Sequence, residues 1–179
     1  MSDIRFSTFP RTEAPQTFVR MIVDAFKAHE AAISTLTLPK GKVSDEVLAE
    51  VSPSLQAIGF QVEASKARID KLERPVFYGE NGEPSLKYEV DAYQPEWRCG
   101  LEVEAGRAWM GNAVYRDIVL STVMVDVDHL VLAVPLQYRF NVGSRQTVSR
   151  DYDNTLRLVE TLFAHTRLKL PYRMTVIGY

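Results

Sequence analysis

The sequence predicts a mixed α/β fold for this 179-residue chain, with a central sheet flanked by helices. Apolar residues recur at helical spacing in several stretches, first in residues 17–37. Residues 129–135, HLVLAVP, form a nearly continuous apolar run, which is typical of a strand buried on both faces. Residues 74–93 alternate between apolar and polar side chains around Asn81-Gly82, a dipeptide that favours a hairpin turn.

The part of the chain before this hairpin is expected to be mostly helical. Residues 1–15 indicate an irregular arm or an edge strand, and the helix over 17–37 should end before Pro39 and Gly41. Ser44 and Asp45 are suited to cap a second helix, which Pro53 should kink or break and which Gly59 should end. A short strand over 60–63 follows.

Strands and helices alternate after the hairpin. We expect strands at 99–105, 129–135 and 172–179, with helices over 109–125 and from Asp151 or Asp153 to about Thr166. Residues 138–152 read as a loop that contains Gly143 and several arginines. Because a strand that follows a crossover helix pairs in parallel, the sheet should be parallel after residue 99 and antiparallel at the hairpin. The expected organisation is a single domain over 1–179, with an N-terminal arm and helix (1–42) and a core (43–179).

Composition excludes several classes of protein and of site. The net charge of −2 means that nucleic-acid binding would depend on a local basic surface. Cys99 is the single cysteine, so neither an intramolecular disulfide nor a cysteine-based zinc cluster is expected. The P-loop, dinucleotide, HExxH and nucleophile-elbow patterns are absent. With no signal-peptide pattern and no apolar run of about 20 residues, the expected location is the cytoplasm.

The stretch GLEVEAGR, residues 100–107, carries the most informative charges. In a strand, Glu102 and Glu104 point from the same face, about 6–7 Å apart. Asp91 ends the second arm of the hairpin, so antiparallel pairing would bring it opposite one of these glutamates. Three converging carboxylates suit a hard cation such as Mg²⁺, which polarises a phosphoryl oxygen and activates a bound water.

An exposed strand face on which glutamates alternate is the other interpretation of this stretch. The crossover helix and the buried strand that follow it place the strand at the centre of the sheet, however. Charged side chains on a central strand are costly unless something compensates for them, which favours the functional interpretation.

The chain resembles the PD-(D/E)XK nuclease superfamily in this region. The family pattern is an acid at the end of one hairpin strand, (Asp/Glu)-x-Lys on the next strand, and then a crossover helix. Glu104 stands where the pattern has lysine, which is similar to the BamHI/BglII-type restriction endonucleases. Residues 155–179 are also similar to the closing helix and strand of such sheets. The segments that carry the likeness are YEVDAY (88–93), GLEVEAGR (100–107), GNAVYRDI (111–118) and HLVLAVP (129–135).

The resemblance implies a restriction-endonuclease-like sheet and a Mg²⁺-dependent DNA endonuclease, with Mn²⁺ as a possible substitute. By position, Asp91 and Glu102 would be the metal ligands, and Glu104 would orient or deprotonate the attacking water in place of lysine. A further acid upstream is common in these enzymes, and the sequence leaves several candidates open. They are Glu50, Asp70 and Glu73.

Four arginines are candidates for contacts with nucleic acid. Arg107 lies nearest the acids and suits a backbone phosphate. Arg116 shares a helix face with Asn112 and Tyr115, where it would touch a phosphate, hold Glu104, or simply pair with Asp117 at the surface. Arg139 and Arg145 lie in the predicted loop 138–152, which is either a DNA-contacting or an ordinary solvated loop.

Two classes of function follow from these residues. The first is a DNA endonuclease that acts as a homodimer, because cutting both strands needs two active sites; the helix over 17–37 is one possible dimer face. The second is a protein with the same fold that binds nucleic acid or a protein partner without cutting. The absent lysine and the near-neutral charge keep this second class open.

Overall fold

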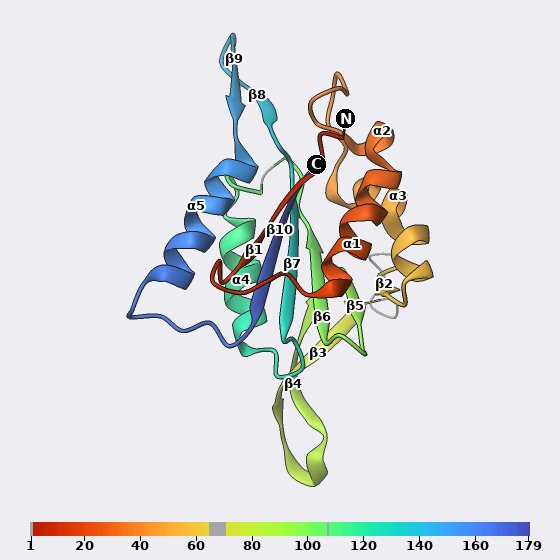
Figure 1. The fold of residues 1–179 in the computed structure, drawn as a ribbon, viewed down its shortest axis with the longest axis vertical. Coiled ribbons are helices and arrows are strands. Elements are labelled where there is room, and N and C mark those ends of the chain that lie inside the picture. The colour runs from red at the N-terminus through yellow and green to blue at the C-terminus, as the bar shows by residue number, and fades with distance from the viewer. Residues whose placement is uncertain (1, 65–70, 107) are drawn as a thin grey trace.

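The computed structural model describes residues 2–64, 71–106 and 108–179. Within these residues it contains a six-stranded mixed sheet with helices on both faces, which confirms the predicted α/β class (Figure 1). The strand order is β1-β10-β7-β6-β5-β2. The strands of this sheet are β1 (Arg5–Phe9), β2 (Gln61–Val62), β5 (Ala92–Gln94), β6 (Cys99–Val103), β7 (His129–Val134) and β10 (Arg173–Gly178).

Strand pairing follows the expected pattern after residue 99, but the arms of the predicted hairpin (Leu72–Tyr78 and Pro84–Val90) pair in a two-stranded sheet of their own and do not join the central sheet. β6 pairs in parallel with β7, and β7 pairs in parallel with β10, each through a helical crossover. β5 pairs with β6 antiparallel, with Ala92 opposite Leu101. The N-terminal residues form an edge strand, because β1 pairs antiparallel with β10. All six residues of β7 are buried, as expected of a strand covered on both faces.

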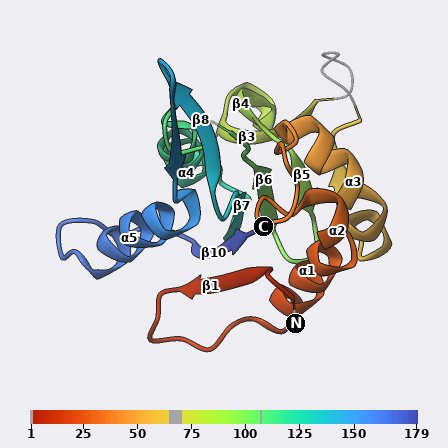
Figure 2. The ribbon, with the colours of Figure 1, turned by 90° about the horizontal axis from the view of Figure 1, so that it is seen from above.

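Helices form one layer on each side of the sheet (Figures 1 and 2). The helices are α1 (Thr17–Ala28), α2 (Glu30–Ile33), α3 (Ser44–Ala57), α4 (Ala113–Val123) and α5 (Asp151–Ala164). One apolar core joins α1 and α3 to the face of β6 that carries Leu101 and Val103. A second core joins α4 and α5 to Leu130 and Leu132 of β7 and to Met174 of β10. Glu102 and Glu104 alternate along the chain with Leu101 and Val103. Their side chains therefore point toward the opposite face of the sheet, which α4 covers.

Two hairpins project from opposite ends of the molecule (Figure 1). The first, β3 (Leu72–Tyr78) and β4 (Pro84–Val90), confirms the predicted hairpin. Its connection is a 3-10 turn over Glu80–Gly82 in place of a two-residue turn, with Asn81 in the left-handed region at φ 60°. The second hairpin, β8 (Tyr138–Val142) and β9 (Arg145–Ser149), lies at the end where β6 and β7 finish.

The prediction of a loop over 138–152 is therefore wrong, and the helices predicted over 17–37 and 109–125 are shorter than expected. Gly143 adopts φ 61° and closes the β8–β9 hairpin, whose aromatic rings Tyr138 and Phe140 stack. The helix over 109–125 begins only at Ala113, because Asn112 has φ 58° and cannot continue a right-handed helix. The helix predicted over 17–37 is divided at His29 into α1 and the short α2, and α2 ends at Ile33. Two residues later, Thr35 donates its hydroxyl to the Tyr179 carbonyl (2.6 Å).

Pro53 does not break the second helix, because α3 continues to Ala57. Pro53 is exposed, and so is Ala49 one turn earlier. The Ala49 carbonyl loses its helical donor at the proline, but water can replace that donor on an exposed side of the helix. The cost of the proline is therefore small enough for the helix to persist.

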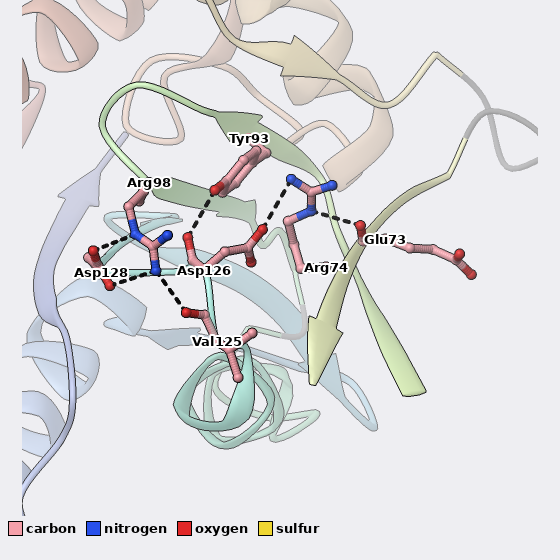
Figure 3. Close-up of polar contacts among 7 residues, drawn as sticks. All are labelled: Glu73, Arg74, Tyr93, Arg98, Val125, Asp126 and Asp128. Carbon is pink, nitrogen blue, oxygen red and sulfur yellow. Dashed lines mark hydrogen bonds and ion pairs between the residues drawn. The ribbon is translucent and has the colours of Figure 1, made fainter. Parts of the chain in front are cut away.

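Polar contacts fix the turn between β5 and β6 against the segment that joins α4 to β7 (Figure 3). Arg98 donates through Nε to Asp128 (2.5 Å), and the Tyr93 hydroxyl donates to the Asp126 carbonyl (2.9 Å). From β3, Arg74 lies over the Tyr93 ring, 4.2 Å from its centroid, and pairs with the Asp126 carboxylate at 3.4 Å. These contacts set the start of β7 and the end of α4. Across the described residues, no helix is long and apolar enough to cross a bilayer.

Candidate functional site

The three predicted acids meet at the carboxyl end of β6. Asp91 is the bend residue directly before β5, and its Oδ2 accepts a hydrogen bond from the Val103 amide at 2.8 Å. Val103 separates Glu102 from Glu104, so this bond holds the Asp91 carboxylate beside both glutamates. The expected proximity of Asp91 to the strand that carries Glu102 and Glu104 is therefore confirmed. In open α/β sheets, ligands usually bind outside the carboxyl ends of the strands, which is where these acids lie.

Asp117 is a fourth acid that the sequence interpretation did not assign to the site. It lies on the inner side of α4 and is 2% exposed. The sequence did carry a signal, because Asp117 lies at helical spacing among residues that face inward. This stripe consists of Val114, Asp117, Ile118 and Ser121, and all four are buried. A carboxylate on the apolar stripe of a helix needs a specific environment, because burying an unpaired charge is costly. Here that environment is the acidic cluster at the end of β6.

Arg116 joins two of the four acids. Its Nη2 donates to Glu104 Oε1 at 3.0 Å, and its Nε donates to Asp117 Oδ1 at 2.9 Å. Of the roles considered for Arg116, the contacts confirm two, holding Glu104 and pairing with Asp117. The surface-pair interpretation is wrong in one respect, because Asp117 is buried, although most of the Arg116 side chain remains exposed (62%).

Burial raises the pKa values of all four acids, and repulsion between carboxylates adds to this for Asp91, Glu102 and Glu104. Burial, followed by the charges of Asp91 and Asp117, raises the pKa of Glu102 well above its usual value. Burial raises the pKa of Asp91 to about 6, and the Val103 hydrogen bond only partly opposes this. Burial and the contact with Asp117 raise the pKa of Glu104 to about 8, and burial also raises the pKa of Asp117. In the absence of a cation, the cluster therefore holds protons at neutral pH.

The donor chemistry of the cluster fits a hard divalent cation. Asp117 Oδ2 is buried and has no hydrogen-bond partner among the described residues. Raised pKa values mean that the carboxylates lack sufficient positive charge around them, which a cation would supply. As the side chains stand, no group of three or more His, Cys, Asp or Glu residues in the described part of the chain is arranged to hold a metal ion. A cation would therefore require the acids to rotate, and to release Arg116 where Glu104 or Asp117 is a ligand.

A cavity of about 490 Å³ opens beside Glu104, between the segment before α3 and the β8–β9 hairpin. Lys40, Lys42 and Arg139 are the cationic residues of its lining, and Glu104 is the member of the acidic cluster that lines it. Lys42 pairs with Glu50, and Arg139 donates to the Leu38 carbonyl at 3.4 Å. The arrangement places positive charge beside an acidic centre, which suits a phosphate group approaching the carboxylates.

The described upstream acids that the sequence offered for the site are not part of the acidic cluster. Glu50 is engaged by Lys42, and Glu73 pairs with Lys87 at 3.6 Å, so neither upstream candidate is held by the cluster. The acid that approaches Asp91 is Glu63, whose amide donates to the Asp91 carbonyl at 2.9 Å and whose charge raises the pKa of Asp91. Glu63 directly follows β2, and it was missed because only the pairing of β2 with β5 brings it beside Asp91.

Two candidates, Asp70 and Arg107, lie outside the described residues. Arg145 is exposed at the start of β9, close to the hairpin turn. Arg139 is also exposed, on β8, but unlike Arg145 it lines the cavity. The structure thus places one of the two hairpin arginines in the lining of the cavity beside Glu104 and the other at the tip of the hairpin.

No protein-family model matches the chain, and the curated proteins contain no match to it.

Proposed function

We propose that the chain is a divalent-cation-dependent nuclease that hydrolyses DNA phosphodiester bonds, and that it acts in the cytoplasm. The observation that carries the proposal is the cluster of Asp91, Glu102, Glu104 and Asp117 beside a cavity with a cationic lining. A protein that buries several acids together pays a cost in stability, and such costs are concentrated at functional sites.

The order of the elements supports the same function. Asp91 lies between the hairpin strand β4 and the short strand β5, Glu102 and Glu104 lie at the end of β6, which pairs with β5, and α4 then crosses to the parallel strand β7. This is the order that the resemblance to PD-(D/E)XK nucleases implies. Glu104 occupies the position of the usual lysine, as in BamHI/BglII-type enzymes.

Each acid has a role in this proposal. Asp91 and Glu102 would hold Mg²⁺, or Mn²⁺ in its place, and the bound ion would supply a water of lowered pKa and polarise the phosphoryl oxygen. Glu104 orients the attacking water and accepts its proton. Arg116 positions Glu104 and Asp117 before substrate binds, because its guanidinium contacts both carboxylates. Asp91 is oriented by the Val103 amide, so it needs no rearrangement of the backbone to serve as a ligand.

DNA binding is assigned to the cavity and the β8–β9 hairpin. Arg139→Ala together with Lys40→Ala should weaken binding of a DNA duplex by about 10-fold at low salt. The double variant should also reduce the slope of the logarithm of the binding constant against the logarithm of the salt concentration by about two. The measurement is fluorescence anisotropy of a labelled duplex in EDTA, which separates binding from cleavage. Arg20→Ala, which removes an exposed arginine from α1, is the matched control and should leave the affinity unchanged. Equal effects of the control and the double variant would show that only bulk charge matters.

Cleavage of supercoiled plasmid DNA tests the catalytic proposal. With Mg²⁺ or Mn²⁺ the wild-type protein should produce nicked and linear DNA, whereas Asp91→Ala should not, because a metal ligand is lost. Glu83→Ala, at the exposed turn between β3 and β4, controls for nuclease contamination during purification and should cleave normally. The proposal fails for DNA and RNA if neither substrate is cleaved faster by the wild-type protein than by Asp91→Ala.

A second function, binding of nucleic acid or protein without cleavage, is favoured by one observation. Arg116 already neutralises Glu104, and the described acids are not arranged as a metal site. Isothermal titration of Mn²⁺ into the protein discriminates the two functions. The nuclease should bind the ion and lose binding in Asp91→Ala, whereas a purely binding protein should show no heat that depends on Asp91.

A further inference from the structure

Arg116 bridges two carboxylates of the acidic cluster that would otherwise repel each other. Its Nη2 donates to Glu104 Oε1 at 3.0 Å and lies 2.9 Å from Asp117 Oδ1. In the part of the chain that the structure describes, no other lysine or arginine forms an ion pair with any of the four acids. The guanidinium therefore supplies the positive charge that a cation would bring to these side chains.

The Arg116 side chain can leave this position without disturbing the core. It is 62% exposed, whereas the side chains of Glu104 and Asp117 are 15% and 2% exposed. The guanidinium thus reaches the two acids from the solvent side, and hydrogen bonds hold it there. Exposed side chains change rotamer rapidly, so loss of these bonds is sufficient to free the guanidinium.

A phosphate group beside Glu104 would offer Arg116 a second set of acceptors. Glu104 contacts Arg116 and also lines the cavity that we assign to DNA. A guanidinium suits a phosphate because its N–H groups can contact two oxygens at once. Two cations of the lining are already engaged, since Lys42 pairs with Glu50 and Arg139 donates to a backbone carbonyl.

We propose that Arg116 exchanges partners, bridging Glu104 and Asp117 in the free protein and contacting a phosphate of the DNA once a cation is bound. This inference rests on the proposed function, because it requires both a cation and DNA at the site. The exchange couples the two ligands: the cation releases the guanidinium, and the phosphate accepts it. Linkage then requires each ligand to increase the affinity for the other by the same factor.

Fluorescence anisotropy of a labelled duplex tests the exchange, with phosphorothioate linkages that keep the negative charge and resist hydrolysis. In EDTA, Arg116→Gln should change the affinity by at most about two-fold, because the acids hold the guanidinium away from phosphate. Mn²⁺ should increase the affinity of the wild-type protein by about 10-fold but that of Arg116→Gln by at most about two-fold. Arg20→Gln, at an exposed arginine of α1, is the matched control and should show the wild-type increase.

The other outcomes separate this inference from the nuclease proposal. If Mn²⁺ increases the affinity of Arg116→Gln as much as that of the wild-type protein, Arg116 only holds the acids. If Arg116→Gln weakens binding equally in EDTA and in Mn²⁺, Arg116 contacts phosphate without any exchange. Either result overturns the exchange and leaves the nuclease proposal standing. Mn²⁺ titration that gives no heat dependent on Asp91 overturns the nuclease proposal and the exchange with it.

Asp117→Asn tests the exchange from the side of the acids. It removes one anchor of Arg116, so in EDTA it should strengthen binding of the duplex by about three-fold through the freed guanidinium. Adding Arg116→Gln should abolish this increase. The double variant leaves no unpaired buried charge at position 117, so it should fold even if Arg116→Gln alone does not, which near-ultraviolet circular dichroism establishes. An increase that survives in the double variant would come from the lost carboxylate charge alone and would overturn the exchange.

Discussion

Glu102→Gln is expected to reduce metal-dependent DNA cleavage by roughly 10³-fold while leaving the chain folded. Glutamine has nearly the same shape as glutamate, so the packing of β6 against β7 should persist. It cannot supply an anionic oxygen, so the cation would lose a ligand at the centre of the sheet. The measurement is the single-turnover rate of cleavage in saturating Mg²⁺, with near-ultraviolet circular dichroism to establish the native packing.

Glu73→Gln is the matched control for this experiment. Glu73 lies on β3, pairs with Lys87, and was a candidate for the upstream acid. Its replacement should leave the cleavage rate within a factor of about two, because surface ion pairs contribute little and it does not approach the cluster. If Glu102→Gln cleaves at the wild-type rate, Glu102 is not a ligand and the proposed site is wrong. If Glu73→Gln abolishes cleavage, Glu73 is the upstream acid and the proposed site is incomplete.

The free energy of unfolding should depend on pH through the acidic cluster when divalent cations are absent. The pKa of Asp91 rises from 3.8 to about 6 on folding. The folded protein thus holds a proton that the unfolded chain has released, so stability is present below about pH 3.8 and is lost as pH rises through about 6. For Asp91 alone this corresponds to about 3 kcal/mol. Glu104 extends the loss toward pH 8, because its pKa is raised to about 8.

Asp91→Asn isolates this effect from the titration of the rest of the chain. Asparagine keeps an oxygen that accepts the Val103 hydrogen bond but cannot ionise. Urea denaturation of both proteins in EDTA gives the difference in the free energy of unfolding at each pH. We expect Asp91→Asn to gain up to about 3 kcal/mol relative to the wild-type protein as the pH rises from about 4 to about 7. A difference that stays constant with pH would show that Asp91 is not perturbed in the folded state.

Much of the fold could be predicted from the sequence because its signals are local. The period of two in residues 74–93 and the apolar run of residues 129–135 identify strands, and both interpretations are confirmed. Helix lengths were harder, because they depend on contacts made after folding. The bond from Thr35 to the Tyr179 carbonyl joins residues 144 positions apart, so no window of sequence around Thr35 indicates where the helix over 17–37 stops.

The residues of the site likewise divide into those that local sequence signals indicate and those that depend on contacts made after folding. The spacing of Glu102 and Glu104 and the position of Asp91 at the end of a hairpin strand are sequence properties, and they were sufficient to bring these acids together. Asp117 and Glu63 were missed, because their roles depend on which side of α4 faces β6 and on where β2 pairs. Antiparallel register fixes contacts between neighbouring strands, whereas the rotation of a helix over a sheet is set by packing on both of its sides.

The stretch GLEVEAGR shows what each level contributes. The sequence by itself determined that Glu102 and Glu104 share one face of a central strand and that a crossover helix follows. Only the tertiary structure decided that Asp117 and Arg116 of that helix point toward them and that a cationic cavity opens beside Glu104. The reason is physical: a period of two is built into the strand backbone, but burial, and therefore the raised pKa values of these acids, exists only when the helix covers the sheet.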